Sequence, residues 1–317
     1  MSLIGIHWAA LDMICLKADT LPEERRQMKY KRAVIAVLIG IILHLAVGQS
    51  AQGSQEHPRS QGMSCFFAGH SFFCPVAMSF DRIARSNDFP EHDLKIVFRG
   101  GQAGTAGALW TAPKARKQIE AVLATGKVEL FGLTPGLSDN EETFQLWFDL
   151  ALKYNPKTRF FIGTPWAMGG AAMDTAMFDK IITGYAKRCA EVVEKLRAAY
   201  PDTQIDFLAY GKMATAMKKR FESESLPGIE VMVGKGNGAF FVDRNPGHAG
   251  PMLLDLCALT WLNELYGADF NSLTYPKNEA DVPAMIEEVM TFNAPFRPAA
   301  SSKDEMKKKA SESTTKG

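Results

Sequence analysis

The sequence lacks an excess of charge of either sign. Its 317 residues contain 36 Lys and Arg against 35 Asp and Glu, which leaves a formal net charge of +1. Nucleic-acid binding depends on a strong positive field at the protein surface. The balanced charge therefore disfavours a nucleic-acid partner.

Cysteine and histidine are scarce. The chain has 5 Cys, none in a CxxC spacing, and 6 His. Zinc ribbons and fingers need such ligands in close pairs, so we expect no metal site. So few cysteines in a chain of this length do not form a disulfide scaffold. Cys65 and Cys74 either pair with each other or remain buried thiols, and the sequence leaves both alternatives open.

Long hydrophobic runs are also lacking, apart from one near the N-terminus. The apolar run over 33–48 follows the basic segment that begins at Met28, and small residues follow it near Ser50 and Gly53. It is shorter than the roughly 20 residues that a membrane-spanning helix needs. The pattern predicts a signal peptide over 28–53, preceded by an over-called start over 1–27. The alternative is an uncleaved anchor.

Cleavage of this segment predicts a secreted or periplasmic protein without stable membrane insertion. A short polar leader over 54–62 then precedes a domain over 63–295. The composition of the chain, with 46% hydrophobic residues, is that of a globular protein. The remaining residues, 296–317, are rich in Ser, Lys, Glu and Thr, and this composition predicts a disordered tail.

Short apolar runs alternate with helical patterns along the domain. We expect buried strands at 63–68, 94–98, 128–133, 159–163 and 205–210. Apolar residues at spacings of three and four predict helices over 174–200 and 251–266. The alternation predicts an α/β protein with a doubly wound parallel sheet in a three-layer α/β/α arrangement. Ligands bind beyond the carboxyl ends of the strands in such folds.

Ser71 follows the first predicted strand, in the segment Gly69-His70-Ser71-Phe72. A helical pattern with Pro75 in its first turn comes next. A helix N-terminus provides backbone N–H groups and a positive dipole end, which favour an oxyanion. We therefore expect Ser71 to act as a nucleophile, with the alternative that it only caps the helix.

Two further segments could complete such a site. Gly100 and Gly101 follow the second strand, and their flexible backbone would let an N–H group approach a substrate oxygen. His248 precedes the last predicted helix, with Asp243 nearby. A neutral imidazole can accept a serine proton, and a carboxylate can fix its tautomer. The alternative is a histidine that only stabilises a turn.

Taken together, these segments resemble the SGNH (GDSL-like) hydrolases. Gly69-His70-Ser71-Phe72 is similar to the first block of the family, Gly100-Gly101 to the glycine block, and the segment from Asp243 to His248 to the terminal block. The resemblance implies a flavodoxin-like three-layer fold. It also implies hydrolysis of an ester or acetyl ester through an acyl-serine intermediate, without metal or organic cofactor, on a small-molecule or carbohydrate substrate.

The sequence departs from the family in two places. The third strand leads into Thr134, where the family has an asparagine that donates to the oxyanion, and the nearest asparagine is Asn140. We expect Ser71, Gly101 and Thr134 to form the oxyanion hole. Asn245 stands three residues before the histidine, where the family has its aspartate. Either Asp243 orients His248 through a longer turn, or Asn245 does so, or serine and histidine act as a dyad.

Two other functions remain open. The departures would also fit a catalytically weak relative that binds a glycan or a partner in the same cleft. A different α/β protein could hold a phosphate or sugar at Ser71 and the Gly100-Gly101 turn.

Overall fold

The computed structural model describes residues 61–275 and 281–298, all within one compact unit of the chain. The start over 1–27, the signal peptide over 28–53 and most of the polar leader lie outside the described residues, as does the tail from 299. No helix in the described part of the chain has the length and apolarity that a bilayer crossing requires.

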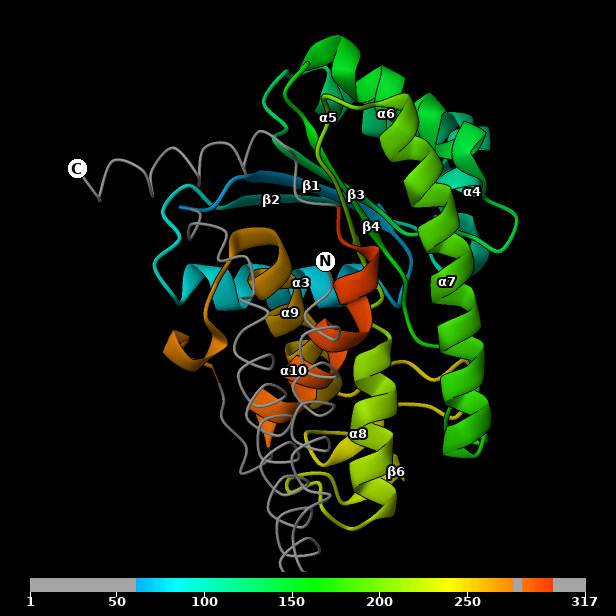
Figure 1. Ribbon diagram of the computed structural model, residues 1–317, viewed down its shortest axis with the longest axis vertical. Coiled ribbons are helices and arrows are strands. Elements are labelled where there is room, and N and C mark those ends of the chain that lie inside the picture. The colour runs from blue at the N-terminus through cyan, green and yellow to red at the C-terminus, as the bar shows by residue number, and fades with distance from the viewer. Residues whose placement is uncertain (1–60, 276–280, 299–317) are drawn as a thin grey trace, which may run out of the picture. The chain divides into compact units, whose positions relative to one another are not determined.

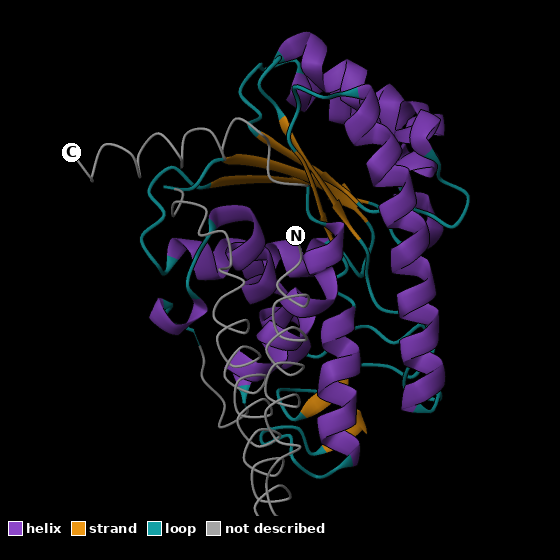
Figure 2. Ribbon diagram, in the orientation of Figure 1, coloured by secondary structure: helices purple, strands orange, loops and turns teal. Residues whose placement is uncertain are grey.

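A parallel sheet of five strands forms the centre of the fold (Figure 2). Its strands lie in the order β2-β1-β3-β4-β5, which is the doubly wound order of flavodoxin. The predicted parallel α/β architecture is therefore confirmed. The strands span Ser64–Gly69 (β1), Asp93–Phe98 (β2), Leu130–Leu133 (β3), Arg159–Gly163 (β4) and Ile205–Leu208 (β5).

Helices cover both faces of this sheet (Figure 1). One face carries α3 (Cys74–Arg85), α8 (Lys212–Glu222), α9 (Pro251–Tyr266) and α10 (Val282–Asn293). The other carries α4 (Ala106–Thr111), α5 (Pro113–Leu123), α6 (Glu141–Tyr154) and most of α7 (Thr175–Ala199). Consecutive strand residues serve opposite faces, because side chains alternate along a strand. Phe66 stacks on Phe131 in one layer, and Phe67 packs against Trp261 in the other.

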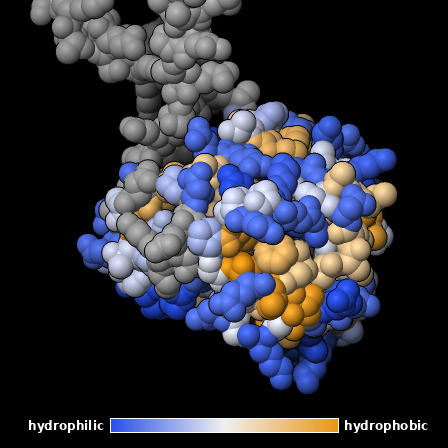
Figure 3. Space-filling view, turned by 90° about the horizontal axis from the view of Figure 1, so that it is seen from below, coloured by the Kyte–Doolittle hydropathy of each residue, from blue (hydrophilic) through white to orange (hydrophobic). Residues whose placement is uncertain are grey.

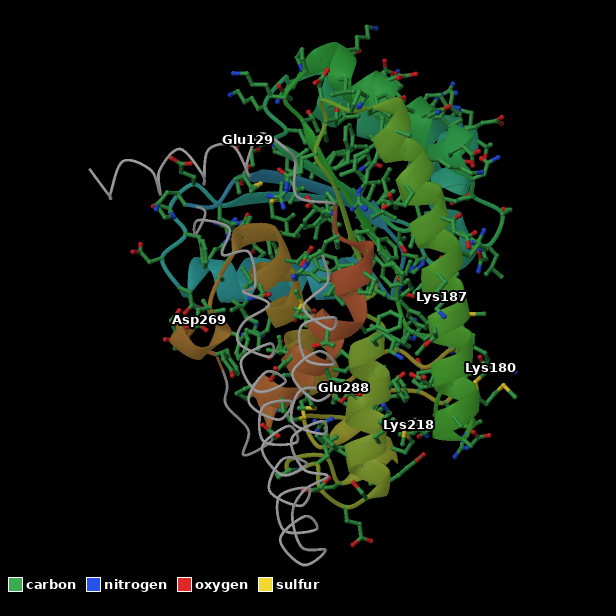
Figure 4. All side chains as sticks on the ribbon, in the orientation of Figure 1. Glu129, Lys180, Lys187, Lys218, Asp269 and Glu288 are labelled. Atoms are coloured by element: carbon green, nitrogen blue, oxygen red, sulfur yellow. The ribbon has the colours of Figure 1, made fainter. Side chains whose placement is uncertain are left out.

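Helix α7 shows how local sequence and tertiary packing combine. The Asp174 side chain accepts a hydrogen bond from the Met177 N–H group at 2.8 Å and thus caps the helix. Lys180 and Lys187, both exposed, lie along this helix (Figure 4). Ile181 belongs to the predicted apolar stripe, yet it is 40% exposed. Its position is explained by the pocket described below.

From the sequence, no ranges were predicted for helices α4, α5, α6, α8 and α10, and some shorter elements were not predicted at all. These shorter elements are the two-stranded parallel sheet of β6 (Val231–Val233) and β7 (Ala239–Phe241), and the short 3₁₀ helices η1 (Gly101–Gly104), η2 (Phe270–Ser272) and η3 (Ala294–Phe296). The chain also stays packed beyond the predicted boundary at residue 295. The Phe296 carbonyl accepts a hydrogen bond from Arg197, and Arg297 pairs with Glu264 at 2.7 Å.

Cys65 and Cys74 do not form a disulfide. Both are free thiols buried in the core. Cys65 Sγ lies 3.3 Å from the Tyr266 hydroxyl, and Cys74 Sγ donates to the Val97 carbonyl at 3.8 Å. Burial raises the pKa of each thiol to about 12, so neither forms a reactive thiolate at neutral pH.

Candidate active site

Ser71 lies in the turn between β1 and α3, at the carboxyl edge of the sheet. The carbonyl of His70 accepts hydrogen bonds from the N–H groups of Phe73 and Cys74, at 3.0 and 2.9 Å, and these bonds close the turn. The N-cap residue of α3 is Phe73. Ser71 is therefore not the helix cap, and that alternative is wrong.

The side chain of Ser71 contacts His248 instead. Its Oγ atom lies 2.9 Å from His248 Nε2, although 177 positions separate the two residues. His248 Nδ1 in turn lies 2.5 Å from Oδ2 of Asp243. The structure thus brings together a hydroxyl, an imidazole and a carboxylate in the order that serine hydrolases use.

Asp243, rather than Asn245, contacts the imidazole. Its Oδ1 atom accepts hydrogen bonds from the N–H groups of Gly247 and His248, at 2.8 and 3.1 Å. Desolvation acts to raise the pKa of Asp243, but the hydrogen bonds from His248 and these N–H groups outweigh it, and the pKa lies below its usual value. Of the alternatives left open by the sequence, the structure therefore has Asp243 orienting His248 through the longer turn.

Hydrogen bonds stabilise the turn that carries His248. Val242 donates to the His248 carbonyl at 2.8 Å, and the Trp166 indole donates to the Gly247 carbonyl at 2.9 Å. Gly247 has a φ of +94°, a conformation that favours glycine. These contacts fix the imidazole beside Ser71.

Of the three predicted oxyanion donors, Ser71 and Gly101 line the pocket and Thr134 does not. Gly101 begins η1 and, with Ser71, lines the pocket. Within residues 61–275 and 281–298, no acceptor is found for the backbone N–H group of either residue. Thr134 is fully buried, and its hydroxyl faces His70 at 3.5 Å rather than the pocket. Asn140 caps α6 by accepting from Thr143 and does not line the pocket, so it does not replace the missing amide donor.

His70 is a site residue that the sequence argument missed. Its Nδ1 atom accepts a hydrogen bond from the Phe72 N–H group at 3.1 Å. A neutral imidazole that accepts at Nδ1 carries its proton on Nε2. Burial lowers the pKa of His70 to about 4, which keeps the ring neutral at neutral pH. The ring lines the same pocket as Ser71. Its place next to the serine was the one signal that could have marked it.

A pocket of about 320 Å³ opens beside Ser71. It lies at the switch point of the sheet, where the strand order reverses between β1 and β3, and this is where doubly wound folds bind ligands. The loops after β3 and β4 and one side of α7 form most of its wall. From these segments come Pro135, Leu137, Trp166, Met168, Ile181 and Tyr185.

The wall formed by the loop after β3 is held rigidly. Asp139 Oδ2 accepts from the N–H groups of Gly136 and Gly107, at 2.7 and 3.2 Å. Arg188 donates to the Gly136 carbonyl at 3.0 Å, and the Tyr185 hydroxyl donates to the Pro135 carbonyl at 2.5 Å. The Gly136 N–H group is thus occupied and is not free to bind a substrate oxygen.

Comparisons with known proteins identify no family. No family model matches this chain, and no curated protein matches it significantly. A solved structure of the periplasmic domain of a lipopolysaccharide acetyltransferase from Salmonella ser. Paratyphi A is 14% identical, with a TM-score of 0.37. That match covers 65% of this chain and 85% of the other. The functional assignment therefore depends on the geometry of the site.

The described residues contain no group of three or more His, Cys, Asp or Glu side chains placed to hold a metal ion. The polar side chains that line the pocket are those of His70, Ser71, Gln102, Thr105 and Tyr185. Two of them are engaged within the protein, because Thr105 donates to the Gln102 carbonyl and Tyr185 to the Pro135 carbonyl. The chemistry that this arrangement supports is nucleophilic attack by Ser71.

Proposed function

We propose that this protein is a serine hydrolase of the SGNH type that cleaves carboxylic esters. The observation that supports the proposal is the hydrogen-bonded chain of Ser71, His248 and Asp243, whose serine lines a pocket. The predicted signal peptide over 28–53 adds a secreted or periplasmic location to this proposal.

In the acylation step, Ser71 Oγ attacks the ester carbonyl carbon while His248 Nε2 accepts the hydroxyl proton. The contact of 2.9 Å between these atoms is within the range for proton transfer. Asp243 stabilises the imidazolium that forms. The tetrahedral intermediate then collapses, the bond to the alcohol oxygen breaks, and His248 returns the proton to the departing alcohol.

In the deacylation step, His248 accepts a proton from a water molecule, whose oxygen attacks the acyl-serine carbonyl. The bond to Ser71 Oγ breaks, the carboxylic acid leaves, and the proton returns to the serine oxygen. The atoms balance as one ester and one water converted to one acid and one alcohol. No cofactor takes part in this scheme.

The oxyanion of each tetrahedral intermediate needs hydrogen-bond donors. We assign the backbone N–H groups of Ser71 and Gly101, which have no acceptor within the described residues, as two of them. The third is His70, whose Nε2–H group would take the part of the missing asparagine amide. Thr134 is buried beside the ring of His70, with its hydroxyl 3.5 Å from His70 Nε2, and is not itself one of the donors.

A fluorophosphonate probe tests this function directly, because it reacts only with an activated serine. We expect the wild-type protein to be labelled, and Ser71→Ala to lose both labelling and hydrolysis of activated esters. Ser71 does not cap α3, so its replacement should leave the melting temperature near that of the wild type. A folded wild-type protein that is not labelled would contradict the proposal and favour a binding protein with the same cleft.

A further inference from the structure

The two sides of the pocket differ in chemistry. Polar lining residues come mainly from the turns after β1 and β2, where Ser71, His70 and Gln102 lie. The loops after β3 and β4 and helix α7 contribute an almost entirely apolar wall. A substrate with its ester group at Ser71 would therefore place its remaining part against apolar side chains.

The two polar side chains in this wall, Trp166 and Tyr185, already donate their hydrogen bonds within the protein. The Trp166 indole N–H donates to the Gly247 carbonyl, and the Tyr185 hydroxyl donates to the Pro135 carbonyl. Trp166 also stacks on Phe72, at 4.9 Å between ring centroids. A sugar placed here would lose water from its hydroxyl groups without gaining side-chain donors from this wall, which is unfavourable. An apolar group meets no such penalty.

The wall continues to the protein surface. Three of its residues are exposed although they are apolar, with exposed fractions of 76% for Leu137, 58% for Met168 and 40% for Ile181. Figure 3 shows hydrophobic side chains gathered between hydrophilic ones on one face of the molecule. Exposed apolar patches of this kind mark binding grooves. The surface around the pocket therefore extends the apolar contact beyond the pocket itself.

The size of the pocket limits the group that it can hold. The pocket has a volume of about 320 Å³. This is the volume of about ten water molecules. A linear chain of about six to ten carbons, or one aromatic ring with a short linker, has this size. An acetyl group would leave most of the pocket empty.

We propose that the substrate is an ester with an apolar group of this size bound in the pocket, rather than an acetylated carbohydrate. The inference depends on the proposed function for its reaction but on the pocket wall for its specificity. The same apolar chemistry can come from the acyl side or from the alcohol side of the ester, and the experiment distinguishes the two.

Two substrate series measure the preference. One varies the acyl chain of p-nitrophenyl esters from acetate to decanoate, and the other varies the alkyl alcohol of acetate esters over the same lengths. We expect kcat/KM to rise about two- to fourfold for each added CH₂ group up to six to ten carbons in one series. The series that rises identifies the side of the ester that enters the pocket. A flat response in both series would overturn the inference.

Helix α7 offers a matched pair of variants. Ile181 lines the pocket, whereas Met177 lies one turn earlier, is 49% exposed and does not line it. We expect Ile181→Asn to lower kcat/KM for the preferred long ester by about tenfold, and to lower kcat/KM for the acetate ester by a smaller factor. Met177→Asn should change neither rate. Equal effects of the two variants would count against the pocket as the binding site.

A binding measurement separates this inference from the proposed function. Calorimetry of 1-octanol with the Ser71→Ala protein needs no catalysis, and we expect saturable binding that Ile181→Asn weakens. Binding without hydrolysis of any ester by the wild type would support the apolar site and contradict the hydrolase. Hydrolysis of acetates with no octanol binding and no chain-length preference would support the hydrolase and overturn the apolar site.

Discussion

The role assigned to His70 can be separated from its structural contact by two substitutions. In His70→Asn, the amide oxygen lies near the former Nδ1 position and can still accept from the Phe72 N–H group, but no atom reaches the Nε2 position. In His70→Gln, an amide N–H group reaches the Nε2 position, but the acceptor for Phe72 is lost. The first variant removes the donor, and the second removes the structural bond.

The expected magnitudes follow from these contacts. The contact of 3.5 Å between His70 Nε2 and the Thr134 hydroxyl is at the long limit for a hydrogen bond, so we expect an oxyanion to compete with Thr134 for the Nε2–H group. Loss of one oxyanion donor costs about 10²- to 10³-fold in kcat. We expect this loss in His70→Asn at nearly unchanged KM and stability. His70→Gln should keep kcat within about tenfold of wild type and lose about 1 kcal/mol of stability through the unpaired Phe72 N–H group.

Single-turnover acylation, urea unfolding and binding of an alkylboronic acid together measure these effects. The boronate forms a tetrahedral adduct with the serine oxygen, so its affinity follows oxyanion stabilisation and should fall in His70→Asn. A merely structural histidine would give the opposite pattern, with His70→Asn active and His70→Gln impaired. That pattern, or equal activity losses in the two variants, would refute the assignment.

Two further predictions concern the same site. Asp243→Asn should lower kcat about 10⁴-fold, because an amide favours the wrong tautomer of His248. Asn245→Ala should keep kcat near the wild-type value. Single-turnover rates of the two variants test this, and a larger loss in Asn245→Ala would reverse the assignment. Burial holds the pKa of His70 at about 4 in the folded protein, below the value of about 6.5 in the unfolded chain. The neutral His70 ring therefore contributes to stability fully above pH 6.5, and this contribution is lost as the pH falls. This contribution should decrease by about 2 kcal/mol between pH 7 and pH 5. Urea unfolding of wild type and His70→Asn at both pH values measures it, and the same pH dependence in both proteins would contradict it.

The sequence by itself determined the layers of this protein. Runs such as 159–163 are apolar and bounded by polar or turn residues, and helix 251–266 begins at a proline and ends at Gly267, so both were predicted with the bounds that the structure has. Such signals are local, because the backbone repeat of a strand or helix determines which residues face the core. Ser71 and His248 were found for the same reason, since each follows a local turn pattern next to a predicted helix.

Only the tertiary structure decided how these side chains meet. The choice of Asp243 over Asn245 depends on hydrogen bonds that close the turn, and the burial of Thr134 against His70 depends on the neighbouring strands β1 and β3. The exposure of Ile181 has the same origin, because α7 passes the open side of a pocket there instead of the core. These features arise from contacts between residues that are distant in sequence or from the path of a turn, which periodicity does not encode.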